Sequence, residues 1–139
     1  MKRKMLITFL APAFILAAVS AVWSQVGFQA AAVLQSSTTA GGQPVQFPLF
    51  RNQITALRAE LAPGGQTGRH MHPVPTFVYV LEGELTVDAD GHGTKVYKAG
   101  DAFLEVVNIW HNGINRTNAP TKFLVVFSGE EGKANLVRP

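Results

Sequence analysis

The sequence predicts an all-β domain, either a sandwich or a barrel, preceded by an N-terminal signal helix. Short runs of β-branched and aromatic residues recur from about residue 45 onward, and turns containing Gly or Pro separate them. No amphipathic helical pattern of any length occurs in this part of the chain, and no internal repeat is visible. The first 24 residues have a different composition, which is apolar after a basic start.

The predicted strands follow one another at short intervals. Thr76–Leu81 is rich in β-branched and aromatic residues, and Glu84–Ala89 alternates between polar and apolar residues, as a half-buried strand does. Residues 90–93 (DGHG) are a hairpin-turn signal that joins this run to the next. The other predicted strands are Val45–Phe50, Gln53–Leu61, Thr94–Lys98, Ala102–Val107 and Lys122–Phe127.

The first 24 residues have the pattern of a secretory signal peptide. A basic start (Lys2, Arg3 and Lys4) precedes an almost entirely apolar run over residues 5–23, and small residues near its end offer cleavage sites after Ala21 or Ser24. An uncleaved anchor is the alternative, because the apolar run approaches the roughly 20 residues that span a bilayer. We therefore expect a signal peptide over residues 1–24, a flexible linker rich in Ser, Thr and Gly over residues 25–44, and the folded domain over residues 45–139.

Composition narrows the classes of partner. The chain carries 12 basic and 9 acidic residues, but the three basic residues of the leader leave nine of each behind. The pI near 9.5 is therefore largely a property of the leader, and no basic run remains to follow a nucleic-acid backbone. The absence of cysteine excludes disulfides and thiolate chemistry. We expect an exported protein, periplasmic or secreted, that is free of the membrane once the leader is cleaved.

The sequence His70-Met71-His72 is the first candidate for a metal site. On a strand, residues i and i+2 face the same side about 6.6 Å apart, so two imidazoles can lean toward one ion at bonds of about 2 Å. By itself the pattern is a weak signal, because two polar residues on one exposed strand face explain it equally well.

Longer patterns around the histidines resemble the two motifs of the cupin family. The first family motif is Gly, five residues, His-x-His, three or four residues, Glu, six residues and Gly; here it reads Gly64, His70-Met71-His72, Thr76 and Gly83. The second is Gly, five residues, Pro-x-Gly, two residues, His, three residues and Asn; here it reads Gly100, Val106-Val107-Asn108, His111 and Asn115. The resemblance covers roughly residues 53–128.

The resemblance implies a small antiparallel β-barrel with a jelly-roll-like path, the double-stranded β-helix of cupins. It also implies that His70, His72 and His111 hold one divalent transition metal near the mouth of the barrel, and that Asn115 orients the loop carrying His111. The family's glutamate is Thr76 here, whose neutral hydroxyl is a poor ligand. The resemblance therefore implies a three-histidine site with open positions, for which iron is preferred and copper, nickel or zinc are alternatives.

Two carboxylates are candidates to replace the missing glutamate. Glu105 lies on the predicted strand before His111, and Glu60 lies on the strand before the first motif. The alternative is that both are surface residues, as charged side chains mostly are. We expect the Thr76 hydroxyl to donate a hydrogen bond to a metal-bound oxygen. The predicted pocket residues are Gln66, Thr76, Val78, Val80, Phe103 and Trp110, with core packing as the alternative for the two aromatic residues.

Two functions remain open at this point. The resemblance is compatible with an iron-dependent, dioxygenase-like oxidoreductase that acts on a small chelating substrate. The alternative is a non-catalytic periplasmic module that binds a small molecule or a metal, because Thr76 leaves no obvious acid or base beside the ion. The resemblance also implies a homodimer that pairs through edge strands, with Val45–Phe50 as an exchanged strand.

Overall fold

The computed structural model describes residues 23–25 and 28–139, and the chain divides into two compact units after Ala32. The described part of the first unit is an antiparallel hairpin of β1 (Trp23–Gln25) and β2 (Phe28–Ala30). The predicted signal peptide covers residues 1–24, of which residues 1–22 lie outside the described residues and the last two lie in β1, so the leader and export stay predictions. Among the residues that the structure describes, no helix is long and apolar enough to cross a membrane.

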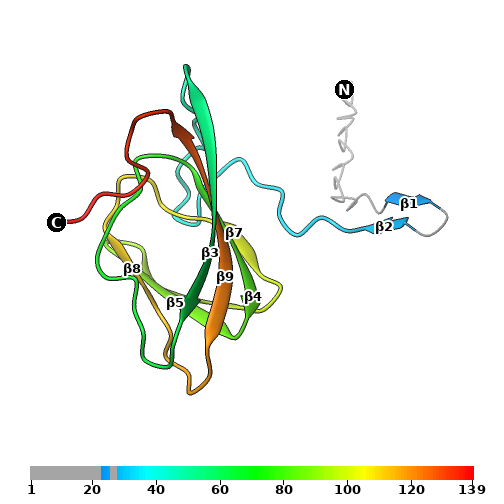
Figure 1. The fold of residues 1–139 in the computed structure, drawn as a ribbon, viewed down its shortest axis with the longest axis vertical. Helices are drawn as coiled ribbons and strands as arrows, with labels where there is room; N and C mark the ends of the chain where they lie inside the picture. Colours follow the sequence, from blue (N-terminus) through cyan, green and yellow to red (C-terminus); the bar gives the residue numbers. More distant parts are fainter. Residues whose placement is uncertain (1–22, 26–27) are drawn as a thin grey trace, which may run out of the picture. The chain divides into compact units, whose positions relative to one another are not determined.

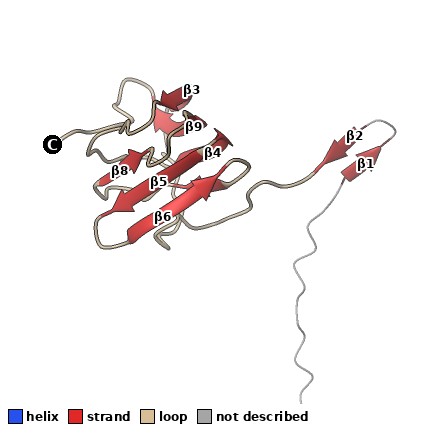
Figure 2. Ribbon diagram, turned by 90° about the horizontal axis from the view of Figure 1, so that it is seen from below, coloured by secondary structure: helices blue, strands red, loops and turns tan. Residues whose placement is uncertain are grey.

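The second unit, residues 33–139, contains two antiparallel sheets (Figure 1). One sheet has the strand order β3-β9-β4-β7 and the other β6-β5-β8, and Figure 2 shows β5 lying between β6 and β8. The strands are β3 (Asn52–Leu61), β4 (Thr76–Glu82), β5 (Glu84–Ala89), β6 (Gly93–Lys98), β7 (Ala102–Leu104), β8 (His111–Ile114) and β9 (Thr121–Glu130). The all-β prediction is confirmed. The predicted closed barrel is replaced by two open sheets, because hydrogen bonds join strands within each sheet and side-chain packing joins the sheets.

Alternation along the strands builds the core between the two sheets. Every second residue of β9 is buried, and its register with β4 sets Val78 opposite Val125 and Val80 opposite Phe123. Leu85 on β5 completes this core from the other sheet. Burying a side chain of this kind contributes about 1.5–3 kcal/mol, so the apolar contacts hold the two sheets face to face.

Residues 66–72 run beside β8 and extend the three-stranded sheet without forming a regular strand. Isolated antiparallel bridges join Gln66 to Ile114 and His70 to His111. The His70 amide donates to the His111 carbonyl at 3.0 Å, and the His111 amide donates to the His70 carbonyl at 2.8 Å. The two histidine-bearing segments therefore lie side by side, although about 40 residues of sequence separate them.

Two of the predicted strands are absent or cut short in the structure. Residues 45–50 form no strand, and Phe47, Leu49 and Phe50 are exposed, so the edge of the four-stranded sheet is β3. The prediction of a strand at Val45–Phe50 is therefore wrong for the single chain, whereas the exchange of this segment between two copies and the homodimer itself stay predictions. The second difference is β7, which ends at Leu104 because the chain then leaves the sheet toward a turn at Asn108.

The end of the predicted linker is packed against the folded domain. Thr39 is buried, and the Ala40 amide donates to the Leu104 carbonyl at 2.7 Å. The Gln43 side chain both accepts from the Val107 amide and donates to the Val107 carbonyl, each at 2.8 Å. These contacts hold residues 39–43 beside the segment that follows β7.

Candidate metal centre

Three buried histidine side chains meet at one point of the second unit. His70, His72 and His111 are each at most 4 % exposed, and their candidate ligand atoms all lie within 4.8 Å of one another. Their ring centroids are 4.4–5.1 Å apart. The bridge between His70 and His111 brings the two segments together, and the extended backbone turns His70 and His72 to the same side.

The three imidazoles use the same ring nitrogen, Nδ1, for their hydrogen bonds to the backbone. Each Nδ1 lies within hydrogen-bond distance of a backbone carbonyl oxygen, which can only accept, so each Nδ1 carries the proton and each Nε2 keeps a free lone pair. Histidines that bind metals are held in this way, with one nitrogen donating to the protein and the other facing the ion. The accepting carbonyls, for His70, His72 and His111 in turn, are those of Gly68 at 2.7 Å, Asn135 at 2.8 Å and Ile109 at 2.9 Å.

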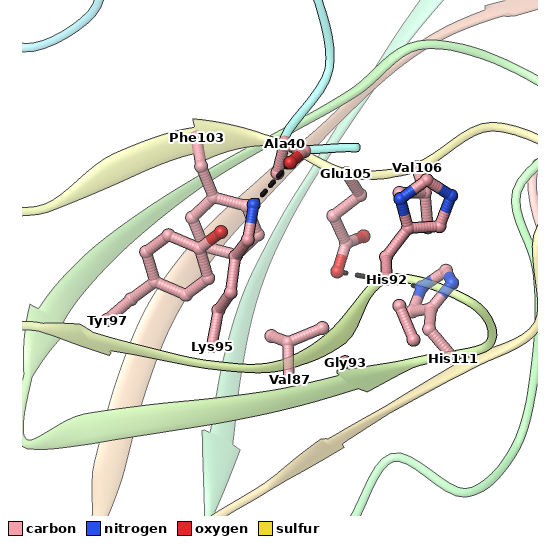
Figure 3. Close-up of a pocket in the computed structure, with 11 residues that line it drawn as sticks. Ala40, Val87, His92, Gly93, Lys95, Tyr97, Phe103, Glu105, Val106 and His111 are labelled. Carbon is pink, nitrogen blue, oxygen red and sulfur yellow. Dashed lines mark hydrogen bonds and ion pairs between the residues drawn. The ribbon is translucent and has the colours of Figure 1, made fainter. Parts of the chain in front are cut away.

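Glu105 adds a carboxylate to this group. Its Oε2 lies 3.0 Å from His72 Nε2 and its Oε1 lies 3.6 Å from His111 Nε2, and the side chain is 10 % exposed. Figure 3 shows Glu105 and His111 pointing toward one another. An Nε2 lone pair and a carboxylate oxygen both accept, so this approach is favourable only with a cation or an added proton between them. His111 Nε2 is also buried without a hydrogen-bond partner. Three imidazole nitrogens and one carboxylate oxygen are a donor set that fits a divalent transition metal.

The pKa shifts have the causes expected of such a cluster. Burial lowers the pKa of His70 to about 4, so this imidazole is neutral and able to bind a metal at pH 7. Burial by itself would raise the pKa of Glu105, but the nearby His111 and His72 rings, which would donate to the carboxylate when protonated at Nε2, outweigh burial and lower the pKa to about 2. Burial also opposes the charged form of His111, but the Glu105 carboxylate, which would accept a hydrogen bond from protonated Nε2 and carries a negative charge, outweighs burial and raises the His111 pKa. Glu105 therefore stays ionised and favours positive charge at the centre.

A cavity of about 340 Å³ reaches His111 alone among these side chains, whereas two other cavities are lined by Glu105 together with one or two of the histidines. The larger of these two has a volume of about 250 Å³ and opens onto His70, His72 and Glu105, and its walls are mostly apolar. Its apolar lining comprises Leu57, Val78, Leu85, Phe123, Val125, Phe127 and Leu136. The smaller cavity, drawn in Figure 3, has about 20 Å³ beside Glu105 and His111, enough for about one water molecule. Of the two cavities that Glu105 lines, only the larger has room for a small organic ligand.

The sequence model of the cupin domain matches residues 57–127, just over half of the chain. This chain belongs to the cupin family. The matched residues include all three histidines and Glu105, so the metal centre lies within the cupin domain. The C-terminal tail, which we define as residues 131–139, lies outside the match.

Relatives of this cupin include enzymes. A germin-like protein of Arabidopsis thaliana, subfamily 2 member 2, is 35 % identical over 82 residues, which are 55 % of this chain and 37 % of the relative. The chain thus spans little more than a third of that protein's length. A sugar phosphate isomerase of the cupin superfamily from Silicibacter pomeroyi matches with a TM-score of 0.50 and 33 % identity, over 55 % of this chain and 51 % of that one. An oxalate oxidase in complex with the substrate analogue glycolate matches with a TM-score of 0.51 and 26 % identity, over 60 % and 45 %.

The cupin glutamate position and Glu105 face one another across two strands. Thr76, at the glutamate position, is fully buried, and its hydroxyl donates to the Val74 carbonyl at 3.1 Å. The register that pairs Phe77 with Leu104 sets Thr76 opposite Glu105, whose amide donates to the Thr76 carbonyl at 2.9 Å. Directly opposed residues point to the same face of a sheet, with Cβ atoms about 4.5–5.5 Å apart. The carboxylate is therefore supplied from the neighbouring strand, and the small threonine leaves it room.

The turn before His111 departs from the cupin motif without losing its shape. Asn108 stands where the motif has glycine, and it adopts the left-handed conformation with φ of 56°. Asparagine tolerates this conformation better than most residues. The Asn108 amide donates to the His72 carbonyl at 2.8 Å, so the turn also ties the two motifs together.

Asn115 lies just after the end of β8 and bonds to neighbouring loops. The side chain is fully buried, and its Oδ1 accepts from the Thr117 amide at 2.9 Å. Its Nδ2 donates to the carbonyls of Leu61, Ala62 and Ala119. These bonds join the end of β8 to two loops.

The remaining predicted site residues are distributed over several environments. Val78 lines the larger cavity and Phe103 the smaller one, whereas Val80 is fully buried in the core. Gln66 is exposed and accepts a hydrogen bond from Asn112 at 2.8 Å. Trp110 packs under the Arg69 guanidinium, which lies 5.7 Å from the ring centroid, and Glu60 is exposed on β3 in register with Lys122.

Sequence reasoning missed the contribution of the C-terminal tail. The Asn135 carbonyl orients His72, and Leu136 and Arg138 line the larger cavity. The tail is held by a bridge in which Val137 and Met71 exchange two backbone hydrogen bonds, of 2.9 and 3.0 Å. Nothing in the composition of this short segment signals that contact. Glu105, by contrast, was already a candidate from the sequence. Alternation along the strand places it on the same face as the core residue Phe103, which favours Glu105 over Glu60 as the carboxylate that faces inward.

Proposed function

We propose that this cupin is a metal-dependent oxidoreductase that holds one iron(II) ion and acts on a small chelating substrate. The observation that carries the proposal is the carboxylate of Glu105, 3.0 Å from His72 Nε2 in the centre of the three histidines. With this carboxylate, the donor set has three neutral nitrogens and one anionic oxygen. Such a set suits iron(II), and it also removes the objection to manganese, which prefers oxygen ligands.

The chain's own residues prepare the centre for a ligand. Backbone carbonyls hold all three imidazoles in the tautomer that directs Nε2 inward. The apolar wall of the larger cavity, which includes Phe123, Val125 and Phe127, limits the water that reaches the centre. When bound, iron(II) supplies open coordination positions for a chelating substrate and for dioxygen.

Two considerations favour an enzyme over a non-catalytic binding module. The sequence argument for a module was that Thr76 leaves no acid or base beside the ion, and Glu105 provides a carboxylate there. In addition, an oxalate oxidase and a sugar phosphate isomerase are among the similar proteins, at 26 % and 33 % identity.

Elemental analysis of the protein purified without chelators tests the metal centre. We expect close to one iron per chain, and at least tenfold weaker iron(II) binding in Glu105→Gln, which keeps the shape of the side chain and removes its charge. Glu60→Gln is the matched control, because Glu60 is exposed on β3. Equal iron binding in Glu105→Gln and the unaltered protein would show that Glu105 is not a ligand.

Oxygen uptake tests the activity. The iron-loaded protein should consume dioxygen with at least one member of a panel of small diketones, thiols and catechols, and Glu105→Gln should consume it more slowly. A fully iron-loaded protein that consumes no dioxygen with any of them would leave a binding module as the better description.

A further inference from the structure

We propose that Arg138 makes the larger cavity selective for a small monocarboxylate with an apolar body. This inference rests on the proposed function, because the ligand would occupy the cavity beside the metal. It goes further by naming a residue outside the matched cupin domain and the chemical class of the ligand.

Backbone pairing aims Arg138 at the cavity. The antiparallel bridge between Met71 and Val137 sets Arg138 opposite His70 and Leu136 opposite His72. Alternation then turns Met71 and Val137 to one side and these four neighbours to the other. In agreement, His70, His72, Leu136 and Arg138 all line the larger cavity.

The Arg138 guanidinium is held in position but largely unpaired. One of its nitrogens, Nη1, donates to the Thr67 carbonyl at 3.2 Å. Among the described residues, 23–25 and 28–139, no carboxylate forms an ion pair with it. The side chain is exposed. A guanidinium has five donors in a planar fork that matches a carboxylate, so several donors remain for a ligand.

The charges and the apolar wall of the cavity also favour a monocarboxylate with an apolar body. Glu105 is the acidic side chain in its lining, and with three neutral imidazoles and a divalent ion the centre keeps one positive charge. Arg138 adds a second positive charge at the edge. Between them the wall is apolar, with Leu57, Val125 and Leu136 among its residues. A monocarboxylate with an apolar body fits this cavity, because its carboxylate can pair with Arg138 while its body packs against the apolar wall.

Calorimetric titration of the cobalt(II)-loaded protein with matched pairs of ligands tests the inference. The pairs are propionate with propionamide and benzoate with benzamide, which have the same shape and differ in charge. We expect the carboxylates to bind more tightly than the amides, and Arg138→Gln to weaken carboxylate binding about tenfold or more while amide binding stays the same. Arg138→Lys keeps the charge without the fork and should lie between the two.

Arg58→Gln is the matched control, because Arg58 is an exposed arginine on β3 between Leu57 and Ala59, whose side chains line the cavity. It should bind the carboxylates like the unaltered protein. A protein that retains cobalt but binds none of the carboxylates, or binds them equally well as Arg138→Gln, overturns this inference and leaves the metal centre standing. A protein that holds no cobalt removes the proposed function and the inference with it.

Discussion

The strands of the cupin domain and the C-terminal tail serve the same centre in different ways. The strands place the metal ligands through regular register, as in the opposition of Thr76 and Glu105 between β4 and β7. The tail reaches the centre through one bridge, from Val137 to Met71, and from there it orients His72 and adds Arg138 to the cavity. From this difference we expect the domain to determine whether a metal is held, and the tail to adjust how firmly it is held and which ligand reaches it.

Removing a ligand from a strand should have the largest effect. His111→Ala takes away one of three imidazoles, at the point where β8 begins, and we expect stoichiometric iron to be lost. Elemental analysis after dialysis measures this directly. His92→Ala is the control, since His92 lies in the exposed β5–β6 turn. If His111→Ala retained a full equivalent of iron, His111 would not be a required ligand, and the contrast between the domain and the tail would fail.

Removing the tail should have an intermediate effect. A chain that ends after Ala134 keeps all four ligand side chains but loses the Asn135 carbonyl that fixes the tautomer of His72. Loss of such an orienting partner typically lowers metal affinity about 10–100-fold. Competition with a chelator of known affinity measures the change, and a chain lacking only Pro139 is the control. If the shortened chain bound the metal as tightly as the full chain, the tail would have no role in orienting His72.

Acidification should have the smallest effect of the three changes. It should lower the free energy of unfolding through His70, which belongs to the cupin domain rather than to the tail. The pKa of His70 in the folded protein, about 4, lies below the ordinary value of 6.5, so the unfolded chain takes up this proton first. The contribution of His70 to stability therefore falls as the pH drops from about 7 to 4. Between pH 7 and pH 5 the loss is about 1–2 kcal/mol.

Urea unfolding of the metal-free protein and of His70→Gln at both pH values measures this contribution of His70. The variant should lose less stability than the unaltered protein on acidification. The raised pKa of His111 acts in the opposite direction, and Glu105 loses its contribution only at lower pH, toward its pKa of about 2. Both groups are present in the two proteins, so the difference in slope reports His70 together with its coupling to His111 and Glu105. Identical pH slopes would contradict the depressed pKa.

Local sequence patterns were sufficient for most of the strands. Alternation and turn residues located β4, β5 and β6 to within a residue or so, because a half-buried strand needs a period of two and a tight turn needs glycine. Val45–Phe50 has the composition of a strand but lacks a partner strand, and a strand forms only when its backbone groups are paired. The short strand β8 went unpredicted, because its Asn and Gly residues are poor strand formers that pairing with β5 overrides.

The sequence by itself determined the three histidine ligands, since their spacing within the two cupin motifs carries them onto neighbouring segments. Only the tertiary structure decided the rest of the centre. Whether Glu105 or Glu60 faces the histidines depends on which strands are neighbours, and whether the tail contacts Met71 depends on a pairing between residues far apart in sequence. Both are long-range contacts, and a pattern read along one chain contains the periodicity of each strand but not the identity of the segment beside it.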